Sequence, residues 1–195
     1  MSADPHVEVE TENHRLSQTP DPLYRRLSAE ERKSIYQLLV FSIWSDGKLS
    51  AREVRTARLV AEGLQVQELL DAGGVLRRNT SFLTEATIAT MSPLSRQVAY
   101  ATAVWAAVVE ERIHRSKARG LRVLRRRLDL DESTANLLEL AANLVHAGTT
   151  LEPALQYGVL LRTTFDHAGV DAGELEEKDF YTADFELGTD QVDAA

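Results

Sequence analysis

The stretch that decides the fold is WSDGKLSARE, residues 44–53. Its Asp-Gly pair is typical of a tight turn, because Gly47 permits a positive φ. Ser50 and Glu53 follow with the spacing of a capping box, in which a serine oxygen and a glutamate carboxylate bind the free amides at a helix start. The stretch therefore predicts one helix before the turn and a second helix after Ser50.

Apolar residues recur at helical spacing on both sides of this turn and through most of the chain. The first helix also begins with a capping box, Ser28 to Glu31. The expected buried faces are Ile35, Leu38, Leu39 and Ile43; Val54, Ala57, Ala61 and Leu64; Leu94, Val98, Ala101, Trp105 and Val108; Leu121, Leu124 and Leu128; and Leu137, Leu140, Ala141, Leu144 and Val145. No run alternates with the two-residue period of a strand, so we predict an all-α protein.

The two halves of the helical region repeat without a gap, and each matched residue in the second half lies 64 positions after its counterpart in the first. The matched pairs are Tyr36 and Tyr100, Val40 and Val104, Phe41 and Trp105, Leu49 and Ile113, Ala57 and Leu121, and Leu64 and Leu128. Any two sets of helices share some of this periodicity, so chance is the alternative to a duplication. A duplication predicts two helical hairpins that pack around a pseudo-twofold axis and bury one core.

Charge divides the chain into a basic middle and two acidic ends. The net charge is −8 overall, but −4 over residues 1–22, −9 over 166–195 and +5 over 23–165. Acidic ends of this kind are typical of disordered tails. We therefore expect a disordered N-terminal tail over 1–22 and a helical domain over 23–148. Residues 149–195 are expected to form a weak helix, interrupted by a glycine, and then a disordered acidic tail.

The composition and the motif content exclude several classes of protein. The chain has no cysteine, which excludes disulfides and thiolate metal sites and favours a reducing compartment. It has neither the start of a signal peptide nor the roughly 20 apolar residues that span a bilayer. HExxH, P-loop, GxGxxG and GxSxG motifs are also absent. We therefore expect a cytoplasmic protein that is not an enzyme.

The turn resembles the repeated signature of the TerB-like domain family, which is named for tellurite resistance. The shared features are an Asp-Gly turn between amphipathic helices, then an apolar residue, a serine cap and a glutamate (residues 46–53). The sequence GLQV at residues 63–66 is also similar to that family. The resemblance covers residues 27–146 approximately. It implies a TerB-like helical bundle with a non-enzymatic role in tellurite resistance or general stress, carried out through protein partners.

The resemblance also implies a metal site at the turn. The acidic pair of the family corresponds to Asp46 and Glu53, and the internal repeat adds Glu110. Oxygen ligands suit hard cations, so the implied cofactor is Ca²⁺ or Mg²⁺. In the second half Lys117 corresponds to Glu53, so acids on both sides of the site are not expected. The alternative is purely structural: Asp46 bonds turn amides and Glu53 only caps a helix.

A basic stretch, RIHRSKARGLRVLRRR at residues 112–127, holds eight bases and no acid. Four arginines share the helix face opposite its leucines, namely Arg115, Arg119, Arg122 and Arg126. Three interpretations are open: a solvated face, a surface that binds acidic protein, phosphate or lipid, or a docking surface for the acidic tail of the chain itself. The stretch has no aromatic residue and the protein is acidic, which argues against dedicated nucleic-acid binding.

The acidic C-terminal tail carries aromatic residues. Phe180, Tyr181 and Phe185 lie in DFYTADFELGTD, residues 179–190. Aromatic side chains among acids are compatible with a short docking motif, and a solvated tail is the alternative.

Overall fold

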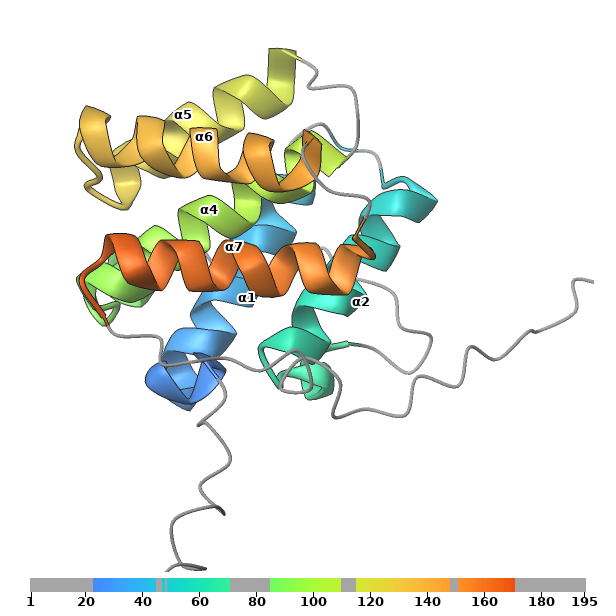
Figure 1. Cartoon of the computed structure of the whole chain (residues 1–195), viewed down its shortest axis with the longest axis horizontal. Helices are drawn as coiled ribbons and strands as arrows, with labels where there is room; N and C mark the ends of the chain where they lie inside the picture. The colour runs from blue at the N-terminus through green and yellow to red at the C-terminus, as the bar shows by residue number, and fades with distance from the viewer. Residues whose placement is uncertain are drawn as a thin grey trace, which may run out of the picture.

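A computed structural model describes residues 23–44, 47, 49–70, 85–109, 115–147 and 151–170. Both acidic tails expected from the sequence, 1–22 and the part after Val170, lie outside these ranges. Every regular element in the described residues is helical, which confirms the all-α class (Figure 1). No helix among them combines the length and apolar character needed to cross a membrane. The elements are a 3-10 turn at Leu23–Arg26, α1 (Ala29–Ile43), α2 (Ala51–Gly63), a 3-10 turn at Gln67–Leu69, α3 (Glu85–Ala89), α4 (Pro93–Val109), α5 (Arg115–Arg127), α6 (Glu132–Ala147) and α7 (Pro153–His167).

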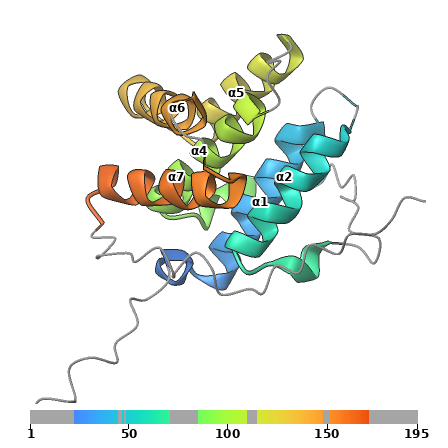
Figure 2. The same cartoon turned by 45° about the vertical axis from the view of Figure 1, so that its right-hand side comes forward.

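Helix α4 lies at the centre of the bundle. It packs against α1, α5, α6 and α7, which surround it (Figure 2). All residues from Val98 to Ala107 are buried, so the helix is covered around its whole circumference. The sequence pattern predicted only one buried face for this helix. Its many alanines bury the other faces as well, because small side chains let neighbouring helices approach closely.

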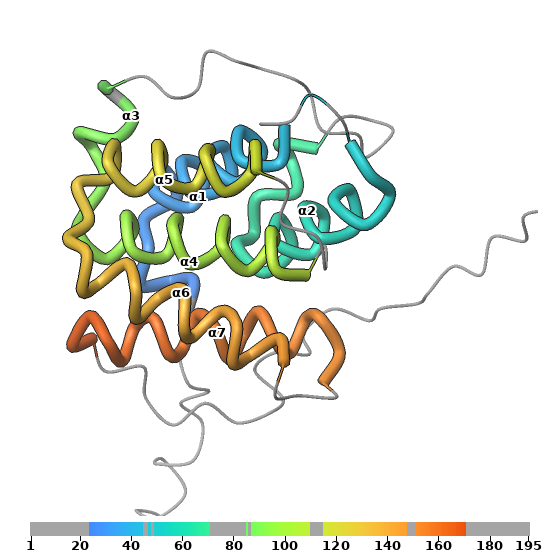
Figure 3. The backbone as a smooth tube through the Cα atoms, turned by 90° about the horizontal axis from the view of Figure 1, so that it is seen from above, coloured from blue at the N-terminus to red at the C-terminus, as the bar shows by residue number. Residues whose placement is uncertain are grey.

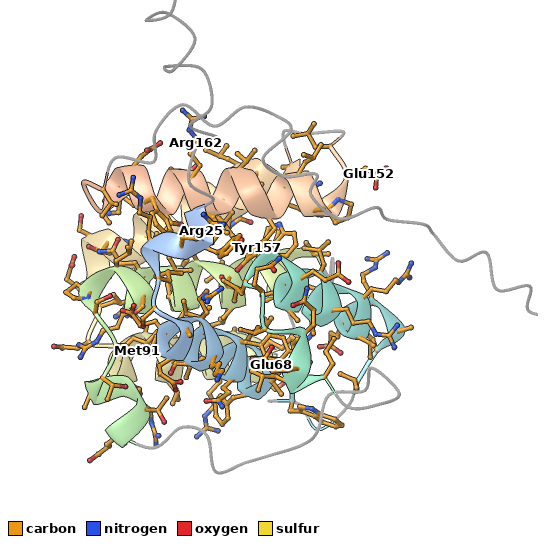
Figure 4. All side chains as sticks on the ribbon, turned by 90° about the horizontal axis from the view of Figure 1, so that it is seen from below. Arg25, Glu68, Met91, Glu152, Tyr157 and Arg162 are labelled. Atoms are coloured by element: carbon orange, nitrogen blue, oxygen red, sulfur yellow. The ribbon has the colours of Figure 1, made fainter. Side chains whose placement is uncertain are left out.

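Helix α7 belongs to the same core. Tyr157 and Phe165 are buried, and the Trp105 ring of α4 lies 5.4 Å from the Tyr157 ring, centroid to centroid. Seen from below, Tyr157 lies between α7 and α2 (Figure 4). Gly158 does not break α7, because tertiary packing outweighs the roughly 1 kcal/mol that glycine costs inside a helix. The core therefore continues beyond residue 148, where the sequence placed the end of the domain.

The orientation of α6 differs from the sequence-based expectation. Leu137, Leu140 and Leu144 were expected to face inward, but they are 46%, 53% and 60% exposed. The residues that face the core instead are Ala135, Leu138, Ala142 and Val145. Two alanines on the inner face, beside Leu138 and Val145, allow α6 to pack closely against the alanine-rich α4.

Helices α2 and α5 have the same bounds and the same C-terminal geometry at the positions that the sequence repeat pairs. Helix α5 begins and ends at the positions that this repeat pairs with the two ends of α2, and each helix has 13 residues. Each is followed by a residue with positive φ, 55° at Gln65 and 54° at Asp129. The next amide, of Val66 or Leu130, donates to the carbonyl five residues before it, at 2.8 and 3.2 Å. Both exits are therefore Schellman motifs with the same backbone geometry.

Glu31 joins the starts of α1 and α4. Its Oε2 accepts the Ser28 amide at 2.9 Å, which completes the first capping box, and its Oε1 accepts the Ser92 amide at 3.2 Å. Burial opposes ionisation of Glu31, but hydrogen bonds from Ser92 and Ser28 outweigh it and lower the pKa of the carboxyl from 4.5 to about 2. The Glu31 carboxylate thus caps two helices while it is charged.

We expect Glu31→Gln to reduce the pH dependence of stability in acid. A lowered pKa means that the carboxylate stabilises the fold fully above about pH 4.5 and loses this contribution as the pH falls towards about 2. The variant should therefore be less stable by about 1 kcal/mol at pH 7 and show a flatter profile between these values. Urea unfolding at a series of pH values measures both effects. The control is Glu30→Gln on the exposed side of α1, and identical profiles for the two variants would contradict the double cap.

Candidate functional site

A buried ion pair joins α2 to α5. Lys117 Nζ donates to Glu53 Oε1 at 2.5 Å, and the lysine and glutamate side chains are only 7% and 5% exposed. Glu53 Oε2 accepts the Ser50 amide at 2.7 Å, and Ser50 Oγ accepts the Glu53 amide at 3.0 Å. The capping box predicted at the start of α2 is therefore present, and each carboxylate oxygen of Glu53 already has a donor.

The predicted metal site is described only at Glu53. Asp46 and Glu110 lie outside the described residues, whereas Glu53 lies beside the Lys117 ammonium, which supplies the positive charge a cation would bring. The recess next to the pair is lined by side chains such as Ile43 and Ala106, and its volume of about 10 Å³ has room for no more than about one water molecule. No three His, Asp or Glu side chains in the described ranges are grouped so that they would hold a metal ion.

The outer face of α5 is strongly basic. Its inner face, which includes Leu121 and Leu124, packs into the core. The basic face consists of the four exposed arginines that the sequence placed together, Arg115, Arg119, Arg122 and Arg126. None of the four forms an ion pair within the described part of the chain; the Arg122 Nε donates only to the Ala118 carbonyl, at 3.4 Å. Exposed guanidinium groups without carboxylate neighbours suit bidentate binding of an anion.

A row of exposed leucines, here called the leucine stripe, follows the outer face of α6. It consists of Leu137, Leu140 and Leu144, at spacings of three and four residues, with exposed and uncharged Asn136 and Asn143 beside it. The sequence reasoning missed this surface because an exposed leucine row has the same period as a buried one. Neighbouring apolar side chains in solvent are typical of a binding surface.

The basic face and the leucine stripe belong to α5 and α6, which both pack against α4 and both lie above it in Figure 1. Tyr100 of α4 connects the two helices. Its hydroxyl donates to Glu139 Oε1 of α6 at 2.5 Å, and it interacts electrostatically with Arg125 of α5. Burial and the Glu139 carboxylate raise the pKa of Tyr100, so the phenol keeps its proton and this hydrogen bond at neutral pH.

Comparisons of the chain with models of known protein families, with curated proteins and with solved structures find no match. The TerB-like resemblance stays a prediction from the residues of the turn and of the repeat. What the protein does must be inferred from the contacts and surfaces described above.

Proposed function

We propose that the chain is a non-enzymatic, TerB-like interaction module that binds an acidic segment of a partner protein through the basic face of α5. The observation that carries this proposal is the set of four exposed arginines, none paired with a carboxylate in the described residues. Lys117, on the opposite face of the same helix, is buried and paired with Glu53. The charge of α5 is thus divided between one internal ion pair and an outer face that attracts anions.

A protein ligand fits this surface better than a nucleic acid or a polyphosphate does. The leucine stripe on α6 offers apolar contacts, which a polypeptide with both acidic and apolar side chains satisfies. The exposed face of α5 has no aromatic residue on which a base would stack.

Several features support a TerB-like bundle made of two duplicated hairpins. The helix bounds and C-terminal motifs of α2 and α5 recur in the register of the sequence repeat. Glu53 and Lys117 are equivalent positions in that register, and they touch. Equivalent residues touch only near an axis that relates the two halves. The role that the resemblance implies, in tellurite resistance or stress, is part of the same proposal and would be carried out through the bound partner.

The geometry favours a function without a metal ion. Both oxygens of Glu53 already have donors, and one of these donors is a cation. A Ca²⁺ or Mg²⁺ site would need Asp46 and Glu110 to replace Lys117 as partners of this carboxylate. The capping interpretation of Glu53 accounts for every contact it makes in the described residues.

We expect the four-arginine variant, Arg115→Gln with Arg119→Gln, Arg122→Gln and Arg126→Gln, to bind a fluorescent poly-glutamate peptide about 10- to 100-fold more weakly. Exposed ion pairs contribute about 0.5 kcal/mol each, which gives about 2 kcal/mol for four. Fluorescence anisotropy at low ionic strength measures the affinity, which should fall as salt is added.

The control variant removes the same charge elsewhere, from four exposed arginines on other elements: Arg26, Arg55, Arg58 and Arg162. Arg162, for example, lies on the outer side of α7 (Figure 4). Equal losses in the two variants would mean that net charge alone, and not the face of α5, binds the peptide. Phosphatidylserine vesicles and unlabelled poly-glutamate can each be used to displace the fluorescent peptide. If the vesicles displace it at a lower concentration of negative charge, the ligand is a lipid surface and the proposal is contradicted.

A further inference from the structure

No described helix covers the leucine stripe. The opposite face of α6 is buried against α4, so the stripe cannot turn inward without exposing Leu138 and Ala142. Its three side chains are each about half exposed, although leucine is among the residues most often buried. A ligand for this surface must therefore present apolar side chains of its own.

A ligand long enough to contact both α5 and α6 must also carry negative charge. The basic face lies on α5, which lies above α4 together with α6 (Figure 1), and Tyr100 of α4 interacts with both helices. A purely apolar segment would leave the arginines without partners, and a purely acidic one would leave the leucines in water. The combined surface thus selects a segment in which acids and large apolar residues are interleaved.

Residues 171–195 of this chain have that composition. They contain nine acidic residues and one lysine, a net charge of −8. Large apolar residues are interleaved with these acids: Leu175, Phe180, Tyr181, Phe185 and Leu187. The charge is opposite to that of the basic face, and the spacing of the aromatics places several apolar contacts within a short segment.

The described chain also ends where this segment can reach the surface. Val170 packs against the core, and its amide donates to the Phe165 carbonyl at 3.0 Å. Figures 1 and 3 show the end of α7 at the same end of the bundle as the end of α5 and the start of α6. Twenty-five residues span up to roughly 80 Å when extended, whereas α6 is about 24 Å long.

We propose that residues 171–195 dock along the leucine stripe, with their acids against the basic face of α5, and so compete with the acidic partner. The competition rests on the proposed function; the docking itself does not. Because the segment is tethered, its effective concentration at the surface is on the order of millimolar, well above that of a free partner of similar composition. A partner therefore binds only when its affinity for the surface is high enough to displace this internal competitor.

The absence of cysteine allows a direct test on the full chain. A nitroxide spin label on Ala183→Cys should remove most of the amide NMR intensity around Leu140 in α6 and leave the signals of α2 unchanged. Unaffected signals in α6 would overturn the proposal. Broadening seen only when spin-labelled protein is mixed with separate, isotope-labelled protein would also overturn it, because the occupant would then be a second copy.

A stripe variant tests the site of docking. Leu137→Ser, Leu140→Ser and Leu144→Ser, combined in the spin-labelled chain, should restore the lost α6 signals. These side chains are exposed, so the fold is retained. The control carries Leu151→Ser and Val159→Ser, two exposed apolar residues outside the stripe, and should keep the broadening. Broadening that persists in the stripe variant would overturn the proposed site.

A binding measurement separates this proposal from the proposed function. Phe180→Ser, Tyr181→Ser and Phe185→Ser, combined, keep the charge of the segment but weaken its apolar contacts. The variant should bind poly-glutamate about 5- to 10-fold more tightly than the unaltered chain, because the tethered competitor is released. If the variant and the unaltered chain bind poly-glutamate equally tightly, and the spin label leaves the α6 signals unaffected, the docking is overturned and the proposed function is not. Broadening of α6 without poly-glutamate binding in any variant would overturn the proposed function alone.

Discussion

Replacing Lys117 with methionine is expected to lower the free energy of unfolding by about 3–5 kcal/mol. The change leaves the Glu53 carboxylate, 5% exposed, without the ammonium that neutralises it. A buried charge that has lost its partner must be desolvated with little compensation, whereas the methionine itself fits the space of the lysine stem. Urea unfolding followed by circular dichroism at pH 7 measures the loss.

Two controls separate this charge effect from ordinary packing. The double variant Lys117→Met with Glu53→Gln removes both charges but keeps an oxygen to accept the Ser50 amide. It should regain most of the lost stability, as a double-mutant cycle would show. The exposed pair of Lys33 and Glu30 in α1 provides the second control, and Lys33→Met should cost no more than about 0.5 kcal/mol. A double variant as unstable as Lys117→Met would mean that the lysine stem, not the ion pair, stabilises the α2–α5 contact.

Phe165→Ala is expected to lower the free energy of unfolding by a similar amount, about 3–5 kcal/mol. The Phe165 ring is fully buried at the end of α7, so its removal loses apolar burial and leaves a cavity. The same denaturation experiment applies. The matched control is Val159→Ala on the exposed side of α7, for which we expect a change within about 0.5 kcal/mol.

This second prediction tests where the domain ends. The limit expected from the sequence was residue 148, and the helix after it was expected to be weak because Gly158 interrupts it. If Phe165→Ala were as stable as the unaltered chain, the burial of α7 would contribute little to the stability of the domain. A large loss would establish that the folded unit includes α7 and extends at least to Val170.

Local features of the fold were correctly predicted from the sequence. Both capping boxes, at Ser28 and at Ser50, are present, because the partners lie three residues apart and meet whenever a helix begins there. The all-α class is confirmed, because helical periodicity is also a local property. The basic face of α5 has the same origin: residues three or four apart share a face of any helix.

The burial of a helix face could not be predicted in the same way. In α6 the leucines at positions 137, 140 and 144 and the inner row at 135, 138 and 142 both have helical spacing, so periodicity alone could not choose between them. The neighbouring helix decided it, since α6 packs closely against the alanine-rich α4 through an inner face that carries two alanines beside Leu138 and Val145. The leucine stripe, and with it the docking surface, is visible only in the tertiary structure.

The candidate site shows the same division. Residue spacing alone predicted that Glu53 begins a helix, that Lys117 occupies the equivalent position in the second half, and that four arginines share one side of that second helix. The contact and joint burial of Glu53 and Lys117 are visible only in the folded bundle. The physical reason is range: capping and amphipathicity depend on neighbours within one or two turns, whereas an ion pair between two helices depends on how the whole bundle packs around α4.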